Sequence, residues 1–122
     1  MTRMTHSTWE NAMSLFAKLQ ESMDKRDSDL LTPLYHDDYQ FVRHQSGTTF
    51  NKEQMLGMLT AMLASDTVQQ NNHRCIYENE DILVEHSIMD FPDGTREAVL
   101  AVHTIKDGRI LKTETGATPL QK

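Results

Sequence analysis

Turn sequences divide the second half of the chain into segments of strand length, and this division limits the possible folds more than any other feature. The turns are Asn79-Glu80, Pro92-Asp93-Gly94 and Asp107-Gly108, and the last is a strong two-residue hairpin signal. Strands are expected at residues 67–78, 81–90, 95–106 and 109–117. Successive strands joined by hairpins form an antiparallel meander, so this half of the chain predicts one antiparallel sheet.

Apolar residues recur at every second position along two of these segments, which is typical of a strand with one buried face. The two sets are Ile82, Val84, His86 and Ile88 on one segment, and Val99, Ala101, His103 and Ile105 on the next. If both sets turn inward, His86 and His103 face each other near a bound ligand. The alternative is that each histidine is a hydrogen-bonded core residue or a contact between subunits.

The first helix is expected at residues 8–25. Its apolar residues recur at steps of three and four, at Trp9, Met13, Phe16, Leu19 and Met23. Ser7 and Glu10 match a capping box, in which each side chain accepts a hydrogen bond from an unpaired backbone N–H at the helix start. A second, short helix is predicted at residues 28–35, where Pro33 removes one backbone donor and keeps the helix brief.

A strand and a third helix follow before residue 66. The residues that favour a strand at 39–44 are Tyr39, Phe41 and Val42. After a short extended piece at residues 48–50, Asn51 and Gln54 match a second capping box and predict a helix start. The apolar stripe of this helix is Met55, Leu59 and Met62.

These elements predict a single α+β domain over residues 1–122. A sheet that is longer than its helices are wide must coil around them or expose apolar surface. Coiling leaves a cavity between the sheet and the first helix, and that cavity is the default ligand site. The convex face of the sheet also carries apolar residues, Leu100 and Val102, so we expect a homodimer through that face.

Charge, length and cysteine content exclude several classes of protein. The 122 residues fit one domain, and a formal net charge of -6 with no basic run longer than Lys25-Arg26 makes nucleic acid a poor partner. A single cysteine, Cys75, allows no intrachain disulfide. Residues 1–6 lack the apolar core of a signal peptide, and no stretch is long enough to cross a bilayer. We therefore expect a cytoplasmic protein without membrane contact.

One passage and two turns resemble a known superfamily. Residues 34–42, Leu-Tyr-His-Asp-Asp-Tyr-Gln-Phe-Val, are similar to the passage out of the second helix in the nuclear-transport-factor-2-like superfamily, which includes ketosteroid isomerases and SnoaL-type polyketide cyclases. Gly47 stands where that superfamily has a glycine after its first strand, and residues 106–110 resemble its last hairpin. The resemblance implies three N-terminal helices packed on a curved antiparallel sheet, which is a cystatin-like cone or α+β barrel.

A comparison with ketosteroid isomerases indicates what this chain lacks. Those enzymes use a tyrosine on the first helix, a basic aspartate after the first strand and a protonated aspartate on a late strand. The corresponding positions here are Leu19, His44 and Ala101. Both oxyanion donors are therefore missing, and the loss of even one typically slows catalysis by about 100-fold or more. Steroid isomerisation is disfavoured, but His44 retains a side chain suited to proton transfer at neutral pH.

The resemblance and the residue chemistry together give a candidate site. The candidate catalytic residues are His44 as general base, with His103 or Tyr35 polarising or orienting the substrate. The alternative for His44 is a solvated loop position. The expected ligand-binding residues are Phe16, Leu19, Phe41, Met55, Leu59, His86, Ala101, Thr113 and Thr115.

Neither a metal nor a cofactor is expected. His73 and Cys75 share a face of one predicted strand, but two ligands do not make a metal site. The sequence contains no glycine-rich phosphate loop and no nucleotide fingerprint. Two functions remain open. The first is a cofactor-free isomerase or lyase of the polyketide-cyclase kind, acting on a small apolar molecule. The second is a non-catalytic module that binds a ligand or associates as a dimer.

Overall fold

The computed structural model describes residues 14–65 and 67–121. Helix α2 spans Leu15–Lys25, and the Ser14 side chain caps its start by accepting a hydrogen bond from the backbone N–H of Ala17 (3.0 Å). The capping box predicted at Ser7 and Glu10 lies outside the described residues. Lys25 in the last turn complements the partial negative charge of the helix end.

The predicted helix at residues 28–35 is replaced by two short 3₁₀ turns, η1 (Ser28–Leu30) and η2 (Thr32–Leu34). Pro33 lies within η2 and has no backbone N–H, so an α-helix cannot continue through it. Strand β1 (Tyr35–Arg43) therefore begins four residues before its predicted start.

The remaining elements are β2 (Thr48–Asn51), α3 (Lys52–Ala64), β3 (Gln69–Glu78), β4 (Ile82–Asp90), β5 (Arg96–Lys106) and β6 (Arg109–Leu120). They form one six-stranded sheet in the order β2-β1-β6-β5-β4-β3. The predicted antiparallel meander of the last four strands is confirmed. However, β1 pairs with β6 in parallel, so the sheet is mixed and not purely antiparallel.

Helix α3 lies between β2 and β3 in sequence, so the helices are not all N-terminal as the resemblance implied. Its predicted capping box is confirmed. The Asn51 side chain accepts from the Gln54 backbone N–H (2.8 Å), and the Gln54 side chain accepts from the Asn51 backbone N–H (2.9 Å). Within the part of the chain that the structure describes, no helix is long and apolar enough to cross a membrane.

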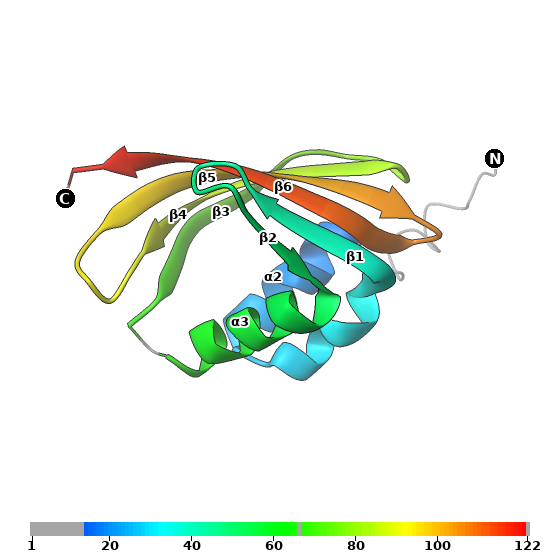
Figure 1. Ribbon diagram of the computed structural model, residues 1–122, viewed down its shortest axis with the longest axis horizontal. Coiled ribbons are helices and arrows are strands. Elements are labelled where there is room, and N and C mark those ends of the chain that lie inside the picture. The colour runs from blue at the N-terminus through cyan, green and yellow to red at the C-terminus, as the bar shows by residue number, and fades with distance from the viewer. Residues whose placement is uncertain (1–13, 66, 122) are drawn as a thin grey trace.

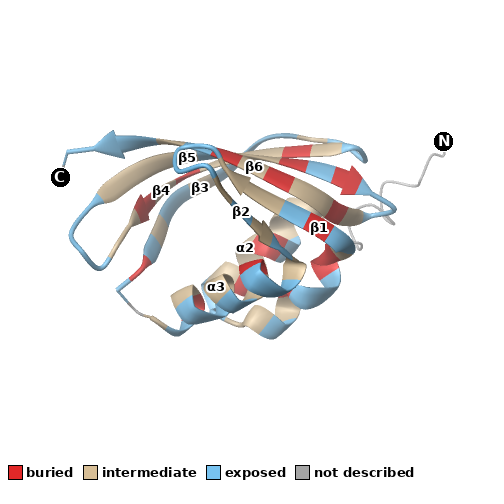
Figure 2. Ribbon diagram, viewed as in Figure 1, coloured by how far each residue is buried: buried red, intermediate tan, exposed pale blue. Residues whose placement is uncertain are grey.

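The sheet arches over α2 and α3, which lie beneath its concave face (Figure 1). The buried residues gather between these two layers and along the middle of the sheet (Figure 2). Arg26 joins the ends of both helices, because its guanidinium donates to the carbonyl oxygens of Leu63 (2.9 Å) and Met62 (3.2 Å) on α3. The apolar core is formed by Leu19, Leu31, Leu34, Tyr35, Tyr39, Met55, Leu63, Leu83, Ile105 and Ile110.

The register between β4 and β5 decides which side chains reach the concave face. Leu83 pairs with His103, and Glu85 pairs with Ala101. Paired residues of an antiparallel ladder lie on the same face, so Glu85 and His103 both face inward. His86 pairs with Leu100 on the convex face, which corrects the expectation that His86 and His103 face each other.

Candidate functional site

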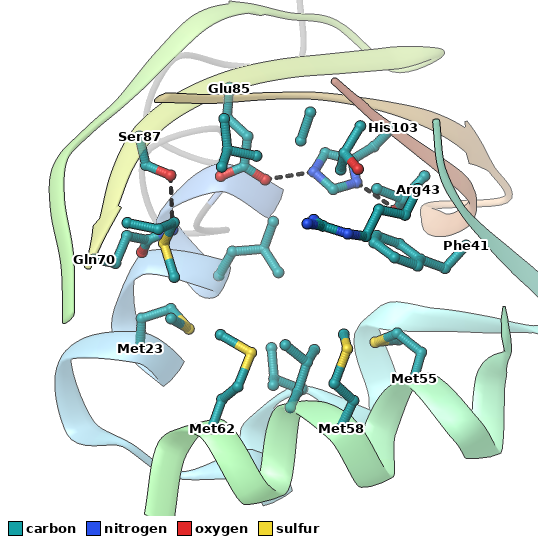
Figure 3. Close-up of a pocket in the computed structure, with 18 of the residues that line it drawn as sticks. Met23, Phe41, Arg43, Met55, Met58, Met62, Gln70, Glu85, Ser87 and His103 are labelled. Carbon is teal, nitrogen blue, oxygen red and sulfur yellow. Dashed lines mark hydrogen bonds and ion pairs between the residues drawn. The ribbon is translucent and has the colours of Figure 1, made fainter. Parts of the chain in front are cut away.

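A cavity of about 350 Å³ lies between the concave face of the sheet and the two helices. Figure 3 shows its two sides: Glu85, Ser87 and His103 project from the sheet, and methionine side chains face them from the helices. The methionines are Met23 from α2 and Met55, Met58 and Met62 from α3. Unbranched thioethers adapt to irregular shapes, so this wall can accommodate a bulky apolar ligand.

Glu85 bridges two histidines in the sheet-side wall of the cavity. Its Oε2 accepts a hydrogen bond from His103 Nε2, and its Oε1 accepts one from His73 Nε2. All three side chains are nearly buried, with exposed fractions of 12% for Glu85, 6% for His103 and 8% for His73. The strand pattern explains the placement, because β3, β4 and β5 are neighbours in the sheet.

The two histidines hold Glu85 in its ionised form. Burial by itself raises the pKa of this carboxyl group, but the hydrogen bonds from His103 and His73 and their charges outweigh burial and lower the pKa to about 2. Glu85 is therefore an anion throughout the neutral range.

Hydroxyl groups continue this chain on the other side of His103. His103 Nδ1 lies 2.7 Å from Thr113 Oγ1, and the Tyr39 hydroxyl is hydrogen-bonded to Thr113. Burial raises the pKa of Tyr39 well above its ordinary value, so the phenol keeps its proton. The result is a carboxylate, an imidazole and two hydroxyls in sequence along the sheet. Tyr35 packs edge-on against Tyr39, with ring centroids 4.8 Å apart.

His73 has a free ring nitrogen at the edge of the cavity. Its Nδ1 is buried and has no hydrogen-bond partner among residues 14–65 and 67–121. The ring packs against Phe16, with centroids 4.6 Å apart. An unpaired N–H is costly when buried, so Nδ1 is the ring nitrogen less suited to carry a proton, and Nε2 is the one that donates to Glu85.

A second polar group, formed by Arg43, Glu97 and Gln45, also lines the cavity. Arg43 Nη2 lies 3.6 Å from Glu97 Oε2, which is beyond ordinary hydrogen-bond length. The Gln45 amide satisfies both of its neighbours when its oxygen faces Arg43 Nη1 (2.5 Å) and its nitrogen faces the carbonyl oxygen of Thr115 (3.1 Å). The guanidinium therefore projects into a largely apolar space with few acceptors around it.

Most of the residues predicted from the sequence do line the cavity. They are Tyr35 and His103 of the catalytic set, and Leu19, Phe41, Met55, Leu59, Ala101, Thr113 and Thr115 of the ligand-binding set. Phe16 is not among the lining residues and instead supports the ring of His73. His86 lies on the convex face, because it pairs with Leu100 there.

His44 requires a correction. It follows β1 on the surface, its side chain is 60% exposed, and its Nε2 lies 3.0 Å from Glu114 Oε1. Arg43 is the last residue of β1 and lines the cavity, whereas His44 is the first residue of the exposed turn at residues 44–47. The solvated position that the sequence left open as an alternative describes this residue.

The sequence interpretation missed Glu85 and Arg43, and it considered His73 only as half of a possible metal pair. Glu85 lies on the face of β4 that has fewer apolar residues, opposite the face of its neighbours Val84 and His86. The alternation pattern therefore assigned Glu85 to solvent. The available signal was chemical: a carboxylate on one strand and histidines on its neighbours.

Cys75, the other member of the possible metal pair, is exposed. Among the described residues, no group of three or more His, Cys, Asp or Glu side chains is arranged to hold a metal ion.

Comparisons with known proteins agree with this architecture. The model of the family described as SnoaL-like domain matches residues 16–113. Among curated proteins, none matches the chain significantly. Similar solved structures include a nuclear-transport-factor-2-like protein of unknown function from Mesorhizobium loti, with a TM-score of 0.75 and 11% identity over 85% of this chain and 88% of that one.

Two further structures are similar to this one. One is IdmH, a candidate polyketide cyclase from Streptomyces antibioticus, with a TM-score of 0.67 and 18% identity over 84% of this chain and 88% of that one. The other is a protein with a cystatin-like fold from Silicibacter pomeroyi, with a TM-score of 0.70 and 18% identity over 86% and 74% of the two chains. At these identities the likeness establishes the fold alone.

Proposed function

This chain belongs to the SnoaL-like domain family of the nuclear-transport-factor-2-like superfamily, and from that premise we propose that it binds a small, mainly apolar organic molecule and transfers protons on it without a cofactor. The reaction class is that of an isomerase or lyase. The observation that carries the proposal is the buried series Glu85, His103 and Thr113 at the wall of an apolar cavity. The structural likeness to a candidate polyketide cyclase is consistent with it.

The series supplies a route for a proton. When His103 is protonated, its Nδ1–H can donate to Thr113, the Thr113 hydroxyl to Tyr39, and the Tyr39 hydroxyl to an oxygen of the substrate. Moving one proton along each of these bonds leaves His103 neutral and the substrate oxygen protonated. The ionised Glu85 carboxylate stabilises the imidazolium before the transfer. This assigns the acid–base role to His103 in place of His44.

One observation favours a second candidate function, which is binding without chemistry. Both ring nitrogens of His103 already have protein partners, and a carboxylate with a pKa of about 2 is a weak base. A cavity of this kind serves equally well to store or sense an apolar molecule. The two functions make the same prediction for binding and differ only in proton transfer.

Exchange of acidic C–H protons separates the two functions. The probe is 2-tetralone, an apolar ketone, incubated with the protein in D₂O while ¹H NMR follows loss of its α protons. Protonation of the ketone oxygen through the His103 series makes an α C–H acidic enough for water to remove it, so we expect exchange faster than in buffer. His103→Gln should lose about tenfold or more of this rate, whereas His44→Gln retains the wild-type rate. Bound tetralone without accelerated exchange favours the non-catalytic function. Failure of tetralone to bind contradicts both.

A further inference from the structure

We propose that the molecule bound in the cavity carries a carboxylate and that Arg43 binds it. This inference rests on the proposed binding function and specifies the class of ligand. It starts from the position of the guanidinium, which projects from β1 into the cavity towards the sheet-side polar groups (Figure 3). The Arg43 side chain is 35% exposed, so it remains accessible within the open cavity.

The protein does not satisfy this guanidinium. Arg43 offers five N–H donors, and the partners that the described part of the chain gives it are the Gln45 amide oxygen and Glu97 Oε2 at 3.6 Å. A charged group in apolar surroundings is costly unless it is well paired. Donors therefore remain for a ligand, and the planar fork of arginine matches the two oxygens of a carboxylate.

The two carboxylates that line the cavity do not prevent an anion from binding. Both oxygens of Glu85 are already engaged as acceptors of hydrogen bonds from His103 and His73. Glu97 Oε1 is buried and has no hydrogen-bond partner in the described residues, so this oxygen is withdrawn from the open space. Glu97 holds the guanidinium in place loosely enough for a second carboxylate to approach it.

The register places Arg43 close to the proposed acid–base series. Arg43 pairs with Thr115 across β1 and β6, and Thr113, the partner of His103, lies two residues earlier on β6. That offset corresponds to roughly 7 Å along a strand. A carboxylate held by Arg43 would therefore direct the neighbouring atoms of a small ligand towards His103 and Tyr39, while its apolar body contacts the methionine wall.

A pair of planar isosteres tests the inference by calorimetric titration. The probes are 2-naphthoate, which carries a carboxylate, and 2-naphthamide, which has the same shape without the charge. We expect naphthoate to bind about tenfold or more tightly than naphthamide, since charge-assisted hydrogen bonds are the stronger kind. Arg43→Met should remove this preference, and Arg43→Lys should restore part of it. Arg109→Met removes the same charge outside the cavity and serves as the matched control.

Glu97→Gln gives an independent measurement if Arg43→Met does not fold. Removing the competing carboxylate frees the guanidinium, so naphthoate should bind severalfold more tightly while naphthamide is unaffected. Equal binding of both probes to the wild-type protein overturns the carboxylate inference and leaves the cavity-binding proposal intact. Binding of neither probe contradicts both. A preference for naphthoate that survives Arg43→Met also overturns the role assigned to Arg43.

Discussion

His103 Nε2 donates a hydrogen bond to Glu85 Oε2, although the two residues are 18 positions apart and belong to different strands. The contact exists because β4 and β5 form one hairpin whose register puts both side chains on the concave face. The hydrogen bond couples the ionisation of Glu85 to His103, and its effects on the stability of the fold can be measured.

Stability should depend on the ionisation of Glu85 at acid pH. Its pKa is lowered from 4.5 in the unfolded chain to about 2 in the fold, so its contribution is fully present above pH 4.5 and is lost as pH falls towards 2. The lost contribution is on the order of 3 kcal/mol. Urea unfolding between pH 2 and 6 should show a shallower pH dependence for Glu85→Gln than for wild type. Glu80→Gln, an exposed turn residue, should retain the wild-type slope.

Thr113→Val should destabilise the fold without changing its shape. The substitution removes the hydroxyl that lies between His103 and Tyr39 and leaves His103 Nδ1 buried without that partner. A buried polar group deprived of its partner costs about 1–3 kcal/mol. Chemical denaturation measures the loss, and Thr118→Val, at an exposed position on the same strand, is the matched control. Equal stability of the two variants would show that the Thr113 hydroxyl contributes nothing.

His44→Ala should have little effect on stability or ligand binding. The side chain is exposed, and surface ion pairs such as the one with Glu114 contribute little because water and salt screen them. The melting temperature should stay within about 2 °C of wild type, and binding of tetralone should be unchanged. A loss of tetralone binding, or a loss of α-proton exchange comparable to that of His103→Gln, would return His44 to the site.

The convex face of the sheet is expected to form a homodimer. In the described residues both helices lie on the concave side, and Leu100 on the other side is 43% exposed beside half-buried Val84 and Val102. Light scattering after size-exclusion chromatography should give a dimer for wild type and a monomer for Leu100→Glu. Ala61→Glu places the same charge on the exposed side of α3 and should leave the dimer intact. A monomeric wild-type protein contradicts the prediction.

Local signals in the sequence were sufficient where a structure depends on neighbouring residues. Asp107-Gly108 predicted the β5–β6 hairpin, and Asp107 and Gly108 both adopt the positive φ angles that such a turn needs. Asn51 and Gln54 predicted the start of α3 for the same kind of reason, since both partners of a capping box lie within one turn. The superfamily resemblance also predicted the order of the elements and most of the residues that line the cavity.

The orientation of each strand face and the partners of the buried polar residues depended on the tertiary structure. The more apolar face of β4, with Ile82, Val84 and Ile88, turned outward, and the face with Glu85 turned inward. An alternation pattern shows that two faces differ but does not say which one meets the helices. The carboxylate is tolerated inside because His73 and His103, from two other strands, satisfy it there.

The turns, the helix start at α3, the antiparallel meander and the kind of side chain available for chemistry could thus be predicted from the residues alone. The parallel pairing of β1 with β6, the solvent-exposed position of His44 and the contact of Glu85 with two histidines became evident only in the folded chain. The two groups of features differ in how far apart along the chain the interacting residues are. Turns and caps are formed by residues a few positions apart, whereas a buried ionised group is stable only when distant strands bring its partners to it.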